Sequence, residues 1–312
     1  MAEIARYQLN EGGGMTAADS VGSADGTLVG SPEWRSGGAN PRGSYLRFGT
    51  GTQVDLPPII TVGPGISCSV TAWLRRQSGS VGEEAAFASG IAAGDFMICL
   101  GTGEWLVDTF SIDIGNAYST LQQCAASAQY ETGRWYHLAA VFRPTTVSVA
   151  NCEDNGSGLI LVTAFGHGLT SGRAVKISGV TGTDEANGLF SVTVVDGQSF
   201  TLDGSTFLNG YTGGGVVLYG EVELFVDAVS QGVEPYGLSV LGSANNDKEW
   251  AIGSKKDFQV NDMFTYQWKG DVDLAAIWDE SLSQSQIDTL FGAGVTGDGT
   301  ASSSDALLLA GD

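Results

Sequence analysis

The chain has 312 residues, of which 14 are basic and 35 are acidic, so its formal net charge is −21 at pH 7. This charge repels phosphate groups, which argues against nucleic acids and anionic membrane surfaces as partners. No apolar run approaches the roughly 18 residues of a membrane span, and the first residues lack the basic and apolar regions of a signal peptide. We therefore expect a protein made in a cytoplasm without a signal peptide and without membrane insertion.

The residue types favour a chain built from strands and turns. Its 46 glycines and 7 prolines separate short apolar segments, and glycine supplies the positive φ angles that hairpin turns need. The four cysteines, at positions 68, 99, 124 and 152, have no C-x-x-C spacing, so buried free thiols are expected rather than a disulfide or a metal site.

The first strand-like segments lie between Tyr7 and Phe142. In "SCSVTAWL", residues 67–74, both alternating faces are partly apolar. A strand inside a two-sheet sandwich has this pattern when something covers its second face. The sequence therefore predicts a sandwich with this strand in its interior.

The stretch "GRWYHLAAVFRPTTVSVANCEDNGSG", residues 133–158, begins as a strand, but the expected second strand of a hairpin does not follow. The candidate partner is "VELFVDA", residues 222–228. The intervening residues 145–219 contain four strand-like segments, "LILVTA", "AVKISGV", "LFSVTVVD" and "SFTLDG", joined by glycine-rich turns. We predict a small β domain inserted at a hairpin tip, where the two ends of an insert already lie close together.

One helix is expected near the end of the chain. In "DESLSQSQIDTLFGAG", Ser283 is a suitable N-cap with Gln286 three residues later, and Gly292 is a suitable stop. Residues 296–312 form a tail of low complexity with an apolar "ALLLA" available for packing on a neighbouring subunit.

Taken in order, these segments resemble the laminin-G-like, or concanavalin A-like, jelly roll. The resemblance rests on four motifs, at residues 19–22, 135–139, 226–228 and 270–273, with Ala228 in place of the usual glycine. It implies an all-β antiparallel jelly-roll sandwich formed by residues 1–144 and 220–295, interrupted by a small inserted β-barrel or sheet at 145–219, with one short C-terminal helix. The insert itself resembles a small β module of bacteriophage tail and fibre proteins, through "HGL", "GRAVKISG", "NGLFSV" and "FTLDG".

Catalytic residue patterns are weak. Only His137 and His167 are present, which excludes the common zinc-enzyme motifs, and packing and turn roles are expected for them. Asp271 and Asp273 would lie on one strand face about 7 Å apart, whereas a retaining glycosidase needs about 5 to 5.5 Å. We expect no enzyme, with a glucanase-like glycoside hydrolase as the alternative.

The resemblance also implies a structural calcium ion, because several aspartates fall near turns where the family binds one. The candidate ligands are Asp19, Asp25, Asp227 and Asp273. The sequence has no contiguous D-x-D-x-D-G loop, and no other cofactor is expected.

Sugar binding by this fold uses aromatic stacking. Four aromatic residues are poorly explained by strand alternation and are candidates for ligand contact, with loop packing as the alternative: Trp105, Tyr118, Tyr211 and Tyr236.

These patterns favour a non-enzymatic structural component of a bacteriophage virion, such as a fibre, tail-tip or capsid-decoration protein, with a lectin-like fold that binds host or environmental glycans. The expected partners are other virion proteins, further copies of the chain and a cell-surface polysaccharide, and the expected location is the virion surface. The alternative is an extracellular or cell-surface carbohydrate-binding or adhesin module of a bacterium.

Overall fold

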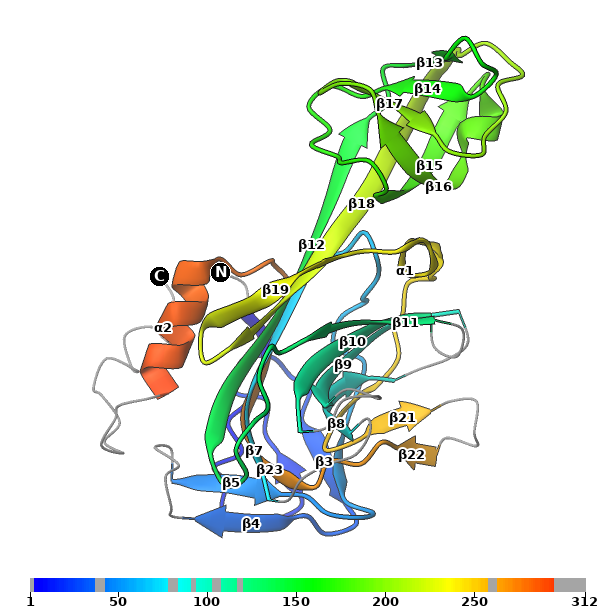
Figure 1. Ribbon diagram of the computed structural model, residues 1–312. Coiled ribbons are helices and arrows are strands. Elements are labelled where there is room, and N and C mark those ends of the chain that lie inside the picture. Colours follow the sequence, from blue (N-terminus) through cyan, green and yellow to red (C-terminus); the bar gives the residue numbers. More distant parts are fainter. Residues whose placement is uncertain are drawn as a thin grey trace.

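Two antiparallel β-sheets dominate the molecule (Figure 1). The computed structural model describes residues 3–36, 43–77, 84–90, 94–102, 108–116, 120–257 and 263–294. The all-β fold with a jelly-roll arrangement, predicted from the sequence, is confirmed.

The first sheet has thirteen strands. Its main path is β13 (Asn151–Asp154), β14 (Ile160–Thr163), β17 (Ser199–Leu202), β16 (Gly188–Val194), β15 (Ala174–Thr181), β18 (Gly213–Val226), β12 (Trp135–Ser148), β7 (Cys68–Arg76), β23 (Gly270–Trp278), β5 (Ser44–Arg47) and β4 (Glu33–Ser36), and β1 (Glu3–Tyr7) and β19 (Val229–Pro235) pair with β23 and β18.

The second sheet has eight strands. In order they are β11 (Thr120–Ala125), β10 (Phe110–Asn116), β9 (Phe96–Thr102), β8 (Glu84–Ser89), β20 (Trp250–Ile252), β6 (Gln53–Leu56), β3 (Gly26–Val29) and β2 (Thr16–Ala17). Three smaller elements and a separate hairpin complete the structure: η1 (Asp184–Ala186), α1 (Leu238–Gly242), α2 (Gln284–Gly294), and β21 (Lys255–Asp257) paired with β22 (Met263–Thr265). No helix among the described residues is long and apolar enough to cross a bilayer.

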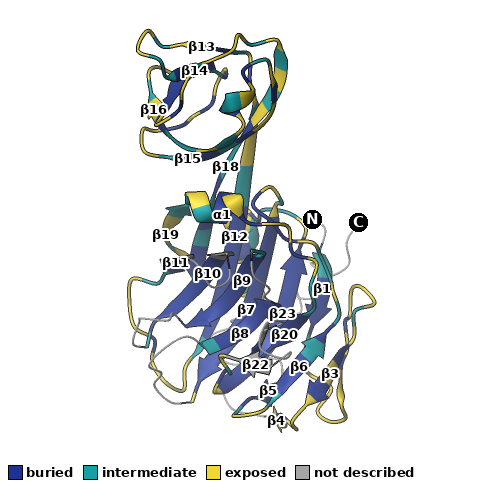
Figure 2. Ribbon diagram, turned by 90° about the vertical axis from the view of Figure 1, so that its right-hand side faces the viewer, coloured by how far each residue is buried: buried dark blue, intermediate teal, exposed yellow. Residues whose placement is uncertain are grey.

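The inner faces of the two sheets enclose one large core. On β7, Val70, Ala72 and Leu74 are fully buried in it, while Thr71 and Trp73 lie on the outer face and are also buried. Figure 2 shows how continuously the strands of the jelly roll are buried. The structure thus confirms that both faces of this strand are covered, as its sequence predicts.

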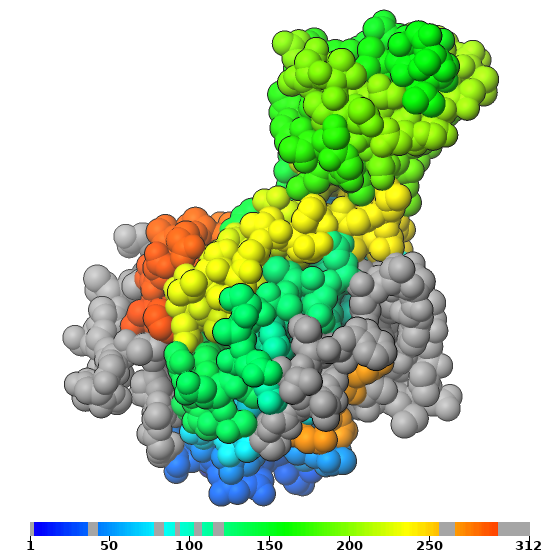
Figure 3. Space-filling view, in the orientation of Figure 1, coloured from blue at the N-terminus to red at the C-terminus, as the bar shows by residue number. Residues whose placement is uncertain are grey.

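Strands β12 and β18 form a long ribbon that leaves the jelly roll. They pair without a register shift from Leu138↔Val226 to Ser148↔Val216. This pairing confirms residues 222–226 as the partner of the "YHLAAVF" strand. The outer halves of the two strands extend into a second lobe that stands above the jelly roll (Figures 1 and 3).

That lobe has its own hydrophobic core. Val162, Val175 and Phe200 are fully buried there. On β18, Val217 belongs to this core, whereas the adjacent Leu218 packs against the core of the jelly roll. We call residues 149–215 the inserted segment; the division of the chain into 145–219 and a jelly-roll domain as separate folding units stays a prediction.

Helix α2 begins as its sequence predicts. The side chain of Gln286 accepts hydrogen bonds from the backbone N–H and the hydroxyl of Ser283, both at 2.7 Å, and the first of these is the side-chain-to-N-cap half of a capping box. The helix runs to Gly294, two residues beyond the expected stop at Gly292. It covers the outer face of the thirteen-stranded sheet, where Phe291 stacks on Trp73 with 5.9 Å between ring centroids.

Two further sequence predictions concern the cysteines and the C-terminal tail. All four cysteines are buried and free, as expected. The tail at 296–312 lies outside the described residues.

Candidate functional site

A row of seven residues crosses the outer face of the eight-stranded sheet, and we call it the outer-face row. Cross-strand pairing joins its members in the order Thr27, Asp55, Ala251, Ala88, Cys99, Asp113 and Gln123. Their neighbours along the strands, such as Val54 and Ile112, point into the core between the sheets. Because side chains alternate along a strand, the row faces away from that core.

The middle of the row has small side chains. Ala251, Ala88 and Cys99 separate the carboxylates of Asp55 and Asp113. The two acids are four strand intervals apart, which corresponds to about 19 Å at about 4.8 Å per interval. The middle of the row is buried, while Thr27 at one end is exposed and Gln123 at the other is half-buried.

Amides and a hydroxyl fix the two acids of the row. The carboxylate of Asp113 accepts hydrogen bonds from Gln123 Nε2 at 2.7 Å and from Ser111 Oγ at 3.1 Å. At the other end, Asp55 accepts one from Gln53 Nε2 at 3.1 Å. An ionised carboxylate is an acceptor only, so these groups match hydroxyl donors such as those of sugars.

The structure does not bring the four aromatic candidates together. Trp105 and Tyr118 lie outside the described residues, in the β9–β10 and β10–β11 connections. Tyr211 packs on the core of the inserted segment and donates hydrogen bonds to the carbonyl oxygens of Val149 and Gly214, at 3.1 and 2.8 Å.

Tyr236 has a different environment from the one expected. It is 1% exposed in the jelly-roll core, with its ring 6.3 Å from that of Phe96. Its ring therefore has no exposed face on which a sugar can stack, and its role is packing.

Asp19 organises a tight turn. Its carboxylate accepts hydrogen bonds from the backbone N–H groups of Arg6, Val21, Gly22 and Ala24. Desolvation raises its pKa, but these hydrogen bonds outweigh that effect and lower the pKa. Asp25 in turn accepts a hydrogen bond from the backbone N–H of Asp19 at 2.8 Å. N–H donors thus occupy both oxygens of Asp19.

Asp227 and Asp273 lie at opposite ends of another row, on the outer face of the thirteen-stranded sheet. Trp73 and His137 stand between them, so the acids are three strand intervals apart, or about 14 Å. Asp227 accepts hydrogen bonds from the backbone N–H of His137 at 2.9 Å and from Arg134 at 2.7 Å. Burial raises its pKa, with these two contacts acting in the opposite direction.

The four aspartates therefore do not converge on one point. Across the part of the chain that the structure describes, no three His, Cys, Asp or Glu side chains are grouped to hold a metal ion. The calcium site stays a prediction.

Asp271 has the surroundings of a structural ion pair. It is fully buried, and its carboxylate receives Arg47 Nε and Arg75 Nε, both at 2.7 Å, and the amide of Gln77 at 2.5 Å. The guanidinium of Arg75 lies over the rings of Tyr45 and Trp135, at 4.9 and 4.6 Å from their centroids. These contacts join β5, β7 and β23, which is a structural role for this buried acid.

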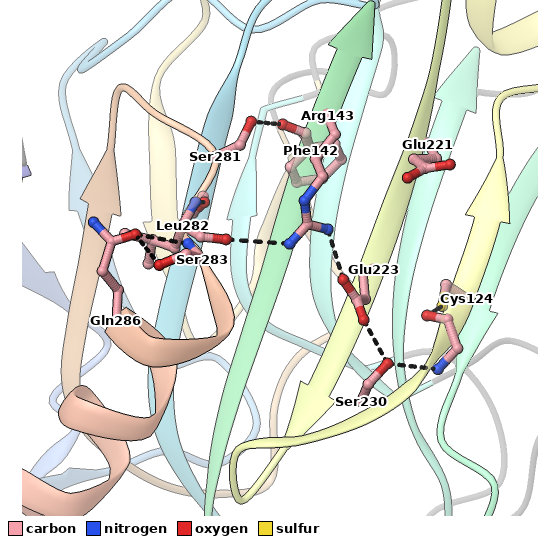
Figure 4. A network of polar contacts seen from close by, with 12 residues as sticks. Cys124, Phe142, Arg143, Glu221, Glu223, Ser230, Ser281, Leu282, Ser283 and Gln286 are labelled. Carbon is pink, nitrogen blue, oxygen red and sulfur yellow. Dashed lines mark hydrogen bonds and ion pairs between the residues drawn. The ribbon is translucent and has the colours of Figure 1, made fainter. Parts of the chain in front are cut away.

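A polar network fixes the base of the ribbon (Figure 4). Arg143 on β12 donates to Glu223 on β18 at 2.7 Å and to the carbonyl oxygen of Leu282 at 3.1 Å. Ser281 donates to the carbonyl oxygen of Phe142 at 2.5 Å, and Ser230 on β19 donates to Glu223. The sequence analysis missed this network, although the acids alternating along "GEVELFV" opposite Arg143 are a signal for it.

Comparison with known proteins agrees with the architecture. A family model described as the concanavalin A-like lectin/glucanases superfamily matches residues 48–159. The match ends within the inserted segment, ahead of β18, β20 and β23, which complete the two sheets. No curated protein matches.

Solved structures share the fold at low sequence identity. Domain 4 of AbnA, a GH43 extracellular arabinanase from Geobacillus stearothermophilus in complex with arabinotriose, is 14% identical with a TM-score of 0.50, over 92% of this chain and 97% of that one. The binding domain of Paraclostridial Mosquitocidal Protein 1 is 7% identical with a TM-score of 0.51, and the botulinum neurotoxin serotype D binding domain is 10% identical with a TM-score of 0.50. Both alignments cover 93% of this chain and 51% of the toxin domain, so the chain spans about half the length of these structures. Residues 48–159 thus match the concanavalin A-like lectin/glucanases superfamily, and the two-sheet architecture of the chain agrees with that match.

Proposed function

We propose that the chain is a non-enzymatic, glycan-binding structural component of a bacteriophage virion surface, as a fibre, tail-tip or capsid-decoration protein. The outer-face row carries the glycan-binding part of this proposal. Its central side chains are buried, whereas Asp55 and Gln123 toward its ends are half-buried, and their carboxylate and amide groups match the hydroxyl groups of sugars.

Two further observations support the proposal. The solved arabinanase domain with the same fold is described in complex with arabinotriose. The inserted segment stands out from one end of the jelly roll (Figure 3), as expected for a module that reaches beyond a particle surface. Its sequence resemblance to small modules of phage tail and fibre proteins supports the virion location.

Glycan binding is tested with the full chain on a glycan array, followed by calorimetry on the best ligand. We expect Asp55→Ala and Gln123→Ala, each of which removes a half-buried polar group toward one end of the row, to weaken binding at least about tenfold. Asp247→Asn, an exposed acid away from the row, is the matched control. The proposed site is wrong if a glycan binds and neither row variant affects its affinity.

The virion location is tested by imaging labelled particles. A label on residues 180–185, which lie in the inserted segment, is expected on the outside of phage particles. Light scattering of the purified chain is expected to show a symmetric oligomer. A strict monomer that does not associate with particles would contradict the virion role while leaving glycan binding intact.

One observation favours a bacterial carbohydrate-binding or adhesin module as the second candidate. The arabinanase domain belongs to a bacterial extracellular enzyme, and the alignment covers 97% of it. Neighbouring genes for capsid, portal and tail proteins support the phage assignment, whereas genes for secretion or polysaccharide use support the bacterial one.

A further inference from the structure

The inserted segment contains three Asn–Gly pairs, and their surroundings differ. They are Asn155–Gly156, Asn187–Gly188 and Asn209–Gly210. In any Asn–Gly pair, the glycine nitrogen is well placed to attack the asparagine side-chain carbonyl carbon, because glycine has no Cβ to obstruct the approach. The hydrogen bonds that the folded chain makes around each pair decide whether the fold promotes or prevents this attack.

At Asn155, three donors converge on the side-chain oxygen. Oδ1 accepts hydrogen bonds from the backbone N–H of Ser157 at 2.9 Å, the hydroxyl of Ser157 at 2.8 Å and the backbone N–H of Leu159 at 3.1 Å. When a nucleophile adds to Cγ, negative charge develops on this oxygen, and donors already in place stabilise that charge. The amide nitrogen Nδ2, which would leave, makes no hydrogen bond to any residue that the structure describes.

The neighbouring Asp154 is placed as the base. Its Oδ1 accepts a hydrogen bond from the backbone N–H of Gly156 at 2.8 Å, which is the proton that must leave before the nitrogen can attack. Gly156 is exposed and has φ of +87°, and a Cβ there would have no heavy atom within 4 Å. Base, nucleophile and oxyanion donors therefore occur within the six consecutive residues from Asp154 to Leu159.

The other two pairs lack this combination. Asn187 is fixed at both ends of its amide, since Nδ2 donates to the carbonyl oxygens of Val180 and Asp184 and Oδ1 accepts from the backbone N–H of Val180. Asn209 donates through Nδ2 to Glu185 at 3.3 Å. In both, the leaving nitrogen is held in place.

We propose that the hairpin between β13 and β14 deamidates itself at Asn155. Asp154 takes the proton from the Gly156 nitrogen, whose lone pair forms a bond to Asn155 Cγ. The tetrahedral intermediate collapses, the Cγ–Nδ2 bond breaks, and the same proton leaves with Nδ2 as ammonia, which gives a five-membered succinimide. Water then opens the ring at Cγ to give aspartate, or at the main-chain carbonyl to give isoaspartate.

The products change the surface of the inserted segment. Either one adds a negative charge, and isoaspartate also lengthens the main chain by one methylene. The β13–β14 hairpin lies in the part of the segment away from the jelly roll (Figure 1), so the change falls on its outer side. The proposal does not depend on glycan binding or on a virion location.

The test is an ageing experiment on the folded full chain, read by peptide mass spectrometry that separates aspartate from isoaspartate. We expect Asn155 to convert at least about tenfold faster than Asn187 and Asn209, which is less than the roughly hundredfold at the low end of what a positioned base contributes. The same chain kept unfolded in denaturant provides the reference. We expect Asn155 to react faster in the folded chain than in the unfolded one, and a slower folded rate would overturn the proposal, because the loop would then protect the amide.

Two variants separate the base from the oxyanion donors. Asp154→Asn keeps an oxygen that can accept the Gly156 N–H but removes the base. Ser157→Ala removes one hydrogen-bond donor to Asn155 Oδ1. Each variant is expected to slow the conversion of Asn155 about tenfold in the folded chain and to leave its rate in the unfolded chain unchanged. Unchanged folded rates in both variants would contradict the mechanism. Asn155→Asp, which mimics one product, serves as the folding control.

Discussion

The jelly roll and the inserted segment use the same two long strands but are stabilised differently. The jelly roll buries charged groups, including the fully buried Arg76 paired with Glu84 and Asp271 paired with Arg75. In the inserted segment, all of which the structure describes, no ion pair joins two residues of 149–215. Its turns are held instead by single side chains that bond to the backbone, such as Glu185 with Leu208 and Asn209.

The difference follows from the way each part closes. Two wide sheets that face each other leave strand positions covered on both sides, and acids and bases there must pair because an unpaired buried charge is costly. The small segment wraps its sheet around one apolar core, and its charged side chains stay outside that core, where acids such as Glu185 satisfy turn N–H groups. The two cores meet on β18, where Val217 and Tyr219 pack with the core of the inserted segment and Leu218, between them, packs against the core of the jelly roll.

The largest expected effect tests whether these two cores unfold separately. Phe200 in the inserted segment and Phe142 in the jelly roll are both fully buried, and truncation of either to alanine is expected to cost about 3–5 kcal/mol. Hydrogen exchange read by mass spectrometry should place the loss from Phe200→Ala in residues 149–215 and the loss from Phe142→Ala in the jelly roll. If both variants lower the protection of all strands equally, the chain is a single folding unit.

The next effect concerns the buried charges that only the jelly roll has. Asp271→Ala leaves Arg75 unpaired in the fold and is expected to cost about 3 kcal/mol, the low end for a broken buried pair because Arg47 is partly exposed. The measurement is the midpoint of urea unfolding. Asp203→Ala, an exposed acid bonded to Thr193 in the inserted segment, is the matched control and should change the midpoint little.

Short-range patterns predicted the elements well. The capping box at Ser283 and Gln286 lies within four residues, and the apolar alternation of β7 lies on one strand, so each can be recognised without knowledge of the rest of the chain. The partner of β12 was also found, because an inserted segment leaves the hairpin's two strand patterns intact on either side.

The candidate site was not predictable in the same way. The outer-face row draws residues from seven strands between Thr27 and Ala251, and it exists only because the register of each strand pair is fixed. Tyr236 was predicted to contact a ligand because strand alternation explains its position poorly. Its backbone N–H bonds to the carbonyl oxygen of Gly220, and this non-local contact accompanies the burial of its ring in the core.

A smaller effect is a pH dependence of opposite sign in the two parts. At Glu185, desolvation raises the pKa, but hydrogen bonds from the backbone N–H groups of Glu185, Asn209 and Leu208 outweigh it and hold the pKa at about 2, below the ordinary 4.5. The folded segment therefore binds fewer protons than the unfolded chain in this window, so the stabilisation is present above pH 4.5 and is lost as the pH falls toward about 2. At Asp227 in the jelly roll, burial raises the pKa, so its contribution is present below the ordinary 3.8 and is lost as the pH rises through the folded value.

Substitution of each acid by its amide separates the two contributions. Glu185→Gln should make the hydrogen-exchange protection of residues 149–215 less sensitive to acid than in the native chain. Asp227→Asn should leave that protection unchanged and alter the pH dependence of the jelly roll alone. If the protection of residues 149–215 is equally sensitive to acid in the native chain and in Glu185→Gln, the pH dependence of this segment comes from other titrating groups.

The smallest effect concerns the turn between β18 and β19, at the jelly-roll end of the ribbon. Asp227 and Ala228 have φ angles of +50° and +62°, the left-handed conformation that a two-residue hairpin turn requires. An alanine in this conformation is strained by about 1–2 kcal/mol, and glycine relieves the strain at an entropic cost of about 0.5–1 kcal/mol. The methyl group of Ala228 also packs against the cluster beneath α2, and this contact is lost. Ala228→Gly is therefore expected to stabilise the jelly roll by about 0.5 kcal/mol, measured by urea unfolding, without changing the hydrogen-exchange protection of residues 149–215.

Asp227→Gly is the contrasting variant, because it removes the hydrogen bonds to His137 and Arg134 together with the strain and should destabilise the chain. Stabilisation by Asp227→Gly as well would show that strain in the turn outweighs both hydrogen bonds.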